Sequence, residues 1–254
     1  QAVAESGSRA VSLGKSYASG GDSFAASIGQ TTSSYGATGV YSVAIGYQNK
    51  ATGPWAFAAG GSGNIASQST SVAIGYSNTA SGERSVALGA NNTSSGYASS
   101  AYGMESKAAH RGKKAYASGR FAATGDAQGG QFILRASTTD ATPTVLSTDN
   151  GSSLSTAQII AASDTCITFD GTITAMQNGA QAYASWRIEG LLVNDGGTTT
   201  LANSATTVID NQSDWVMALS ADNTNNALAI TCTGEASHNI RWVANIRTTE
   251  VTYA

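Results

Sequence analysis

Short apolar segments alternate with small and polar residues in the first half of the chain, and they recur at a nearly constant interval. The clearest copies read Ser42-Val43-Ala44-Ile45-Gly46 and Ser71-Val72-Ala73-Ile74-Gly75. Alternation with a period of two predicts strands of four or five residues, and a fixed interval predicts stacked coils. Helices are excluded because Gly, Ser, Thr and Asn dominate each repeat. The repeats end at Gly14, Gly29, Gly46, Gly60, Gly75, Gly89, Gly103 and Gly119, which are 14 to 17 residues apart.

The alternation also predicts which side of each strand faces inward. Val72 and Ile74 share one face of their strand, while Ser71 and Ala73 share the other. We expect the larger pair to fill a narrow interior and Gly75 to supply a turn. The small outer face then suits close contact with other chains, so we expect a homotrimer around a threefold axis. A monomeric β-solenoid is the alternative.

A second signal, such as Ala51-Thr52-Gly53 or Ala80-Ser81-Gly82, follows each clear copy about seven residues later. The combined motif resembles the head repeat of trimeric autotransporter adhesins of the YadA type, over residues 9–125. The resemblance implies a left-handed parallel β-roll with one coil per repeat. The same repeats also occur in bacteriophage tail fibres. The heptad stalk that follows the head in such adhesins has no counterpart in this sequence.

The second half has a different pattern, in which strand-like runs are separated by turn signals every 8 to 15 residues. This spacing predicts an antiparallel β-sandwich of the jelly-roll kind, with Trp186, Trp215 and Trp242 in its core. The run Ile240–Val251 resembles the final strand of a domain found in phage virion and tail-fibre proteins. The turn signals are Asp149-Asn150-Gly151, Asp170-Gly171, Asn178-Gly179, Asp195-Gly196-Gly197 and Asp222-Asn223.

Charge separates the two halves as sharply as the pattern does. Residues 1–127 hold nine Lys and Arg against five Asp and Glu, and residues 128–254 hold four Arg against eleven acids. We therefore predict two domains, a β-roll trunk at 1–127 and a terminal sandwich at 128–254. The dispersed cations of the first half do not make a nucleic-acid surface. No apolar run approaches the roughly 18 residues of a membrane span.

Candidate catalytic chemistry is sparse. His110 and His238 have no second ligand at metal spacing, and Cys166 and Cys232 read as buried free thiols. Most acids stand at turns, where Asp bonds the backbone, so a depolymerase with two facing carboxylates is a minor alternative. We expect no catalytic residue, no metal, no cofactor and no enzymatic activity.

Surface recognition is the function that remains. The resemblances imply the tip of a phage tail fibre in a virion, joined to other tail proteins upstream and binding a bacterial surface glycan or protein. Turns on a rigid scaffold carry most recognition, so our candidates there are Asp195, Asp222, Asn223 and His238. An alternative set on the roll is Tyr47 and Tyr76, which we place two coils apart on one edge, with Trp55 in the first turn of the intervening coil. The head of a bacterial adhesin that binds extracellular matrix is the rival function.

Overall fold

The computed structural model describes residues 3–4, 9–29, 34–151, 154–179, 182–211 and 215–253. The described chain is β-rich, with one short helix, α1 (Leu154–Ala157). It divides into two compact units, Gln1–Gly125 and Asp126–Ala254. That the two are separate domains, with the boundary at residues 127 and 128, stays a prediction.

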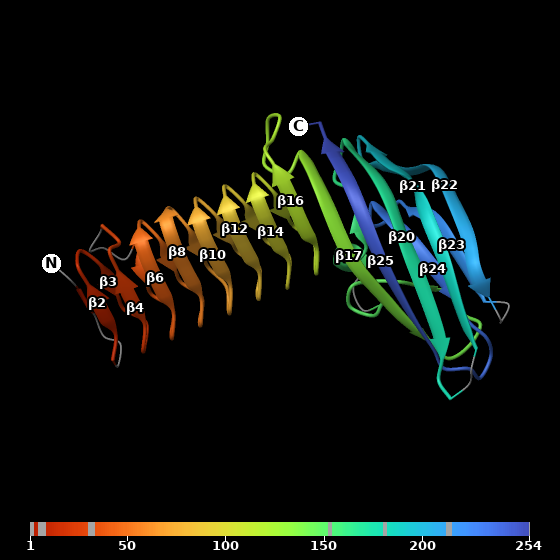
Figure 1. Ribbon diagram of the computed structural model, residues 1–254, viewed down its shortest axis with the longest axis horizontal. Coiled ribbons are helices and arrows are strands. Elements are labelled where there is room, and N and C mark those ends of the chain that lie inside the picture. The colour runs from red at the N-terminus through yellow and green to blue at the C-terminus, as the bar shows by residue number, and fades with distance from the viewer. Residues whose placement is uncertain are drawn as a thin grey trace. The chain divides into compact units, whose positions relative to one another are not determined.

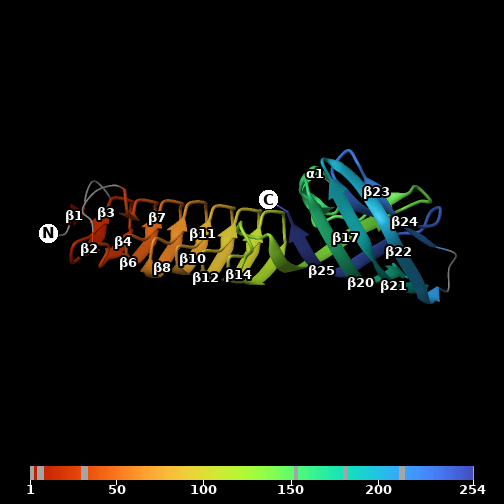
Figure 2. The same cartoon turned by 90° about the horizontal axis from the view of Figure 1, so that it is seen from above.

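The first unit is a parallel β-solenoid whose coils each give one strand to each of two sheets (Figures 1 and 2). Neighbouring coils pair in register, for example Val72 with Val86 and Gly75 with Gly89. The predicted coil-by-coil stacking is confirmed, while the left-handed sense and the trimer stay predictions. One sheet contains β1 (Val3–Ala4), β3 (Tyr17–Ala18), β5 (Gly36–Ala37), β7 (Lys50–Ala51), β9 (Ile65–Ala66), β11 (Thr79–Ala80), β13 (Thr93–Ser94) and β15 (Lys107–Ala108). The other contains β2 (Val11–Leu13), β4 (Phe24–Ala26), β6 (Val43–Tyr47), β8 (Phe57–Ser62), β10 (Val72–Tyr76), β12 (Val86–Ala90), β14 (Ser100–Met104) and β16 (Lys114–Ser118).

The predicted orientation of the solenoid strands is wrong. Ala73 is fully buried between the two sheets, Val72 is half-buried, and Ile74 is 36% exposed on the outside. The interior is narrow, so most strands turn a single alanine methyl group inward, while β13 buries the hydroxyl of Ser94. The inward positions of both sheets form a core of alanines in two clusters. The second cluster contains Ala101, Ala108 and Ala115. The first contains Ala18, Ala25, Ala37, Ala44, Ala51, Ala58, Ala66, Ala73, Ala80 and Ala87 together with Ile28 and Ala56.

A ladder of buried asparagines joins successive coils. Asn78 donates from Nδ2 to the carbonyl oxygens of Ile74 (2.9 Å) and Gly89 (2.7 Å). Its Oδ1 accepts from the backbone N of Asn92 at 3.0 Å and from the Asn92 side chain at 3.1 Å. Asn49 and Asn64 repeat the arrangement, and Ser106 ends the ladder. Because each amide is saturated inside the solenoid, the ladder fixes the register of one coil on the next.

The second unit contains two antiparallel sheets. The larger has the strand order β17-β25-β20-β21-β22, and in the smaller β24 pairs with β18, β19 and β23. The jelly-roll assignment stays a prediction. The strands are β17 (Ala127–Thr138), β18 (Thr144–Val145), β19 (Ile159–Ile160), β20 (Thr165–Gln177), β21 (Tyr183–Asp195), β22 (Thr198–Asn211), β23 (Val216–Asp222), β24 (Ala227–Thr233) and β25 (Ile240–Thr252).

Side chains from both sheets form one hydrophobic cluster, which contains the three tryptophans as predicted. Trp242 lies 5.7 Å from Trp186 and 5.6 Å from Trp215 between ring centroids. Its indole N–H donates to Thr138 Oγ1 at 3.0 Å, so the polar end of the most buried tryptophan is satisfied.

The turn predicted at Asp170-Gly171 does not exist, because both residues lie inside the continuous strand β20. A Cβ on Gly171 would lie 2.5 Å from Ile246 Cδ1, so this glycine makes room for a core side chain. Asp170 points outward instead and pairs with Arg247. The glycine of this Asp-Gly pair lets a neighbouring strand and its side chain approach closely inside the sheet. The sequence pattern alone does not distinguish such a pair from one in a hairpin turn.

Candidate functional site

The structure brings three of the predicted recognition residues to one end of the second unit. Asp195 is exposed at the end of β21, Asp222 ends β23, and Asn223 begins the turn between β23 and β24. Asn223 Oδ1 accepts from the backbone N of Thr199 at 2.7 Å, which ties this turn to the start of β22. Asn223 thus has a structural role in addition to any role in binding.

Asp222 is also engaged within its own turn. Its carboxylate accepts from the backbone N of Thr224 and Asn225, both at 3.0 Å, and from Asn225 Nδ2 at 2.7 Å. Burial raises the pKa of Asp222, but these donors and the Gln158 side chain outweigh burial and hold the pKa below its usual value. The carboxylate is an ionised turn-stabilising group.

His238 lies at the other end of the unit. It precedes β25, whose first residue pairs with Thr138, whereas Thr252 at the far end pairs with Thr165. Twelve residue steps at about 3.4 Å separate these ends by roughly 40 Å. His238 Nδ1 is 3.4 Å from Glu235 Oε2 but does not form a hydrogen bond with it. The four candidates therefore do not form one site.

The aromatic candidates on the roll also lie at two different places. Tyr47 and Tyr76 are exposed at the ends of β6 and β10, while Trp55 precedes β8. Trp55 therefore lies in a turn of the intervening coil, away from the strand ends that hold the two tyrosines. Trp55 is 59% exposed and stacks on Tyr41, with ring centroids 5.8 Å apart and planes 14° apart. Tyr41 was not among the predicted residues.

A second feature of the roll that the sequence analysis missed is a tyrosine contacted by two arginines. The guanidinium carbons of Arg111 and Arg84 lie 4.2 Å and 5.3 Å from the centroid of the Tyr97 ring. The three residues come from turns of successive coils, so the coil period of 14 residues places them together. This cluster is a rigid cationic group on the roll.

The outer face of β17, β25, β20 and β21 carries the most varied chemistry. Along β25 burial alternates strictly, so Arg241, Val243, Asn245 and Arg247 point away from the core. We call the outward side of these four strands the outer face. All four arginines of residues 128–254 lie on it, namely Arg135, Arg187, Arg241 and Arg247.

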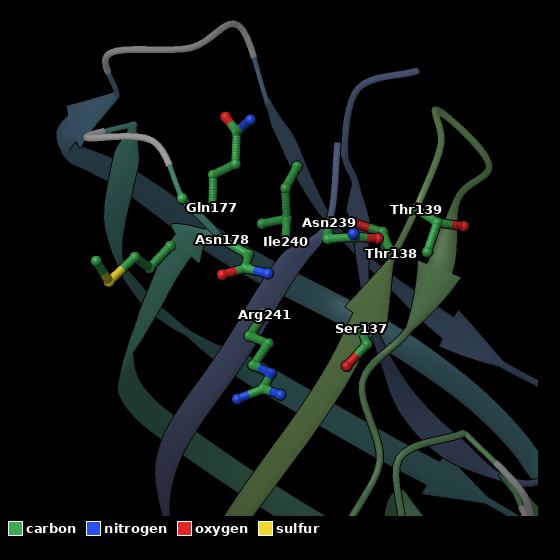
Figure 3. A pocket seen from close by; sticks show the side chains of 10 residues that line it. Ser137, Thr138, Thr139, Gln177, Asn178, Asn239, Ile240 and Arg241 are labelled. Carbon is green, nitrogen blue, oxygen red and sulfur yellow. The ribbon is translucent and has the colours of Figure 1, made fainter. Parts of the chain in front are cut away.

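Three hollows open along the outer face. The first, of about 500 Å³, lies at the strand ends and includes Ser137, Asn178 and Arg241 (Figure 3). The register places Ser137 beside Arg241 and Arg241 beside Met176, so three neighbouring strands build this hollow. The backbone N of Asn178 donates to the carbonyl of Asn239 at 2.8 Å, which holds the hairpin against β25.

The other two hollows, of about 470 and 490 Å³, share Asp170. Arg247 donates to Asp170 Oδ2 at 2.9 Å, and Glu189 stands directly opposite Asp170 on β21. Gly190 forms part of the floor, where a Cβ would lie 2.6 Å from the Phe169 ring. Guanidinium, carboxylate and amide groups therefore meet over a flat backbone floor.

Hydrogen-bonding groups on a firm sheet can hold a polar ligand of repeating units. Gln131 Nε2 donates to Asn245 Oδ1 at 2.9 Å, so these amides have fixed orientations beside Arg247. Among the described residues, no group of three or more His, Cys, Asp or Glu side chains could hold a metal ion. The described part of the chain also contains no helix long and apolar enough to cross a membrane.

Comparison with known families identifies the repeats of the first unit. The YadA head domain repeat matches residues 37–62 and 66–92 as two copies, which is less than half of the chain. No curated protein matches the sequence.

Two solved structures of phage tailspikes are similar at low identity. One is tailspike protein gp49 of Acinetobacter baumannii bacteriophage Fri1, a capsular polysaccharide depolymerase, with 8% identity and a TM-score of 0.27. The other is the tailspike protein of A. baumannii phage AM24, with 10% identity and a TM-score of 0.26. The matches cover 89% and 84% of this chain but 39% and 50% of the tailspikes, so the chain spans half or less of their length.

This comparison corrects one prediction made from the sequence. We expected no enzymatic activity, but one of the similar tailspikes is a depolymerase and therefore an enzyme.

Proposed function

We propose that the protein recognises a bacterial cell surface and that the outer face of the second unit binds a surface glycan. The observation that carries this proposal is the row of three hollows, whose side chains supply amides, hydroxyls, guanidinium groups and carboxylates. Sugar hydroxyls are both donors and acceptors, so a mixed set of this kind suits them. A sheet also holds these groups more firmly than a mobile loop would.

The wider role belongs to the same proposal. The repeats of the first unit support an adhesin-like trunk, and the resemblance of the second half to phage virion domains favours the tip of a tail fibre in the virion. Three copies of the chain would give three glycan sites, which raises the affinity for a repetitive surface by avidity. Asp195, which is exposed at the end of β21, is a further candidate contact at the rim.

An adhesin head that binds through the roll is the rival function. The exposed stack of Tyr41 and Trp55 favours it, because aromatic faces bind sugars and protein partners alike. The family match to residues 37–62 includes both residues.

Binding of the fluorescently labelled full chain to a panel of bacteria tests the proposal. Periodate treatment of the cells, which destroys glycans, should abolish binding, whereas protease treatment should not. Asn178→Ala and Asn245→Ala should each weaken binding two- to tenfold, as expected for about 0.5–1.5 kcal/mol per lost hydrogen bond.

Trp55→Ala is the matched variant on the roll, and it should bind as the wild type does. Loss of binding in Trp55→Ala, with both asparagine variants unaffected, would move the site to the roll and support the adhesin role. Protease-sensitive, periodate-resistant binding would replace the glycan by a protein receptor.

A further inference from the structure

The arginines of the second unit are distributed unevenly. Residues 128–254 hold four arginines against eleven acids, yet every arginine lies on the outer face. The carboxylates facing the same way on this sheet are Asp170, Glu189, Asp195 at the end of β21, and Asp210 on β22, which stands opposite the outward Ser185. The outward side of this sheet therefore holds every arginine of an acidic unit, interspersed with four of its eleven acids.

Three of the four guanidinium groups have no acidic partner within the described residues. Arg247 forms an ion pair with Asp170 at 2.9 Å, but no carboxylate of the described residues lies within ion-pair distance of Arg135, Arg187 or Arg241. Internal ion pairing therefore does not explain why these cations share one face. Like charges held near one another repel, and an anionic ligand relieves that repulsion.

The register gives the positions of these groups. Arg241 and Arg247 are six residues apart on β25, or about 20 Å at roughly 3.4 Å per residue. Arg135 stands on β17 beside Val243, and Arg187 stands on β21 in the row of Asn245. The guanidinium groups are thus spread along and across the sheet, so several units of a polymer could each meet one.

We infer that the outer face binds an acidic polysaccharide, with the arginines receiving carboxylate groups of successive sugar units. This inference rests on the proposed function and names the class of glycan. The planar guanidinium fork matches a carboxylate with two parallel hydrogen bonds. Asp170 and Glu189 stand between the arginines and accept hydrogen bonds from sugar hydroxyls.

The test uses polysaccharide extracted from a strain to which the full chain adheres. One portion stays native, and in the other the uronic acid carboxyls are reduced to alcohols with carbodiimide and borohydride. The wild type should bind the native polymer at least tenfold more tightly. Its affinity for the native polymer should fall as salt rises from 0.15 M to 1 M, where the screening length shrinks from about 8 Å to about 3 Å.

The double variant Arg187→Gln/Arg241→Gln should bind the native polymer about a hundredfold more weakly, at about tenfold per charge-assisted contact. Both side chains are exposed, so its melting temperature should match the wild type. The matched control, Lys15→Gln/Arg84→Gln, removes two positive charges from the roll and should lose less than threefold.

Other results would overturn the inference in distinguishable ways. Equal binding to the native and the reduced polymer would mean that the chain recognises uncharged parts of the glycan. The proposed function would then stand, and the inference that the glycan is acidic would be wrong. A loss confined to the Lys15→Gln/Arg84→Gln control places acid binding on the roll near Tyr97. If the chain binds neither polymer and still adheres to periodate-treated cells, both the proposed function and this inference are wrong.

Discussion

Gly75 shows how a single residue sets the spacing of the coils. Its φ is +123°, and a Cβ built on it would lie 2.0 Å from the carbonyl oxygen of Gly89 in the next coil. Gly46 and Gly89 repeat this contact with the coils that follow them. The recurrent glycine is thus required twice, for its backbone conformation and for the close approach of the next strand.

Replacing Gly75 by alanine separates these two requirements when it is compared with Gly14→Ala. Gly14 also has a positive φ, +71°, but a Cβ added there would have no neighbouring atom closer than 4.0 Å. Gly14→Ala should lower the free energy of unfolding by about 1–3 kcal/mol, the cost of backbone strain. Gly75→Ala should cost clearly more, as measured by thermal melting. Equal losses would mean that the coils can move apart at Gly75.

The two cysteines should differ sharply in reactivity. Cys232 is fully buried, and burial raises the pKa of its thiol to about 12. Cys166 is half-buried on the outward side of β20, and both thiols are free. At pH 8 a pKa of about 12 leaves roughly a thousandfold less thiolate than an ordinary pKa of about 8.5. A thiol reagent should modify one cysteine per folded chain and two in guanidinium chloride. Two rapid reactions in the folded protein would contradict the burial of Cys232.

At the scale of elements, the sequence predicts where the strands lie better than it predicts which side of each strand faces the core. The period of the glycines gives the stacked coils, and the turn signals give the hairpins at Asn178, Asp195 and Asp222. The inward side of each coil could not be inferred from hydrophobicity, because the width of the interior, rather than apolar character, selects alanine. The expected order of Ile74 and Ala73 is therefore reversed.

The asparagine ladder could be predicted once the coil is known, because Asn78 and Asn92 each follow a repeat glycine by three residues. The candidate site has no such signal in the sequence. The outer face depends on the pairing of β25 between β17 and β20, which are neighbours only in space. Arg187 and Arg247 could not be assigned to one surface without that register.

The turn between β23 and β24 should make stability depend on pH through Asp222. Its pKa is lowered in the folded state, so its contribution is present above the unfolded value of about 3.9 and is lost as pH falls through the lower folded value. Asp222→Asn should destabilise the protein by at most about 1 kcal/mol at pH 6, because the carboxyl is only partly buried and water screens its interactions. The difference from the wild type, measured by urea unfolding, should shrink below pH 4. A constant difference down to pH 2 would assign the effect to packing instead.

At the scale of the whole molecule, the reversed faces give the predicted trimer a different physical basis. One outward row of the roll runs through Ala59, Ile74, Leu88 and Tyr102 of successive coils, each paired with the next. Strands lie about 4.8 Å apart, so the row is a continuous apolar stripe. Stable monomers rarely expose long apolar stripes. Association of three copies through this stripe, rather than through small Ser and Ala faces, is the form of the trimer we now expect.

Substitutions at two neighbouring positions test this expectation. The wild type should sediment at three times 25.6 kDa at micromolar concentration. Ile74→Asp puts an unpaired carboxylate into each copy of the interface, so the variant should sediment as a monomer with its strand content unchanged by circular dichroism. Ala73→Asp places the same charge inside the coil and should unfold the roll itself. Thr70→Asp, at an exposed turn with φ of +54°, is the control and should remain trimeric. A wild type that sediments as a monomer would contradict the trimer, and a trimeric Ile74→Asp would show that the copies meet on another face.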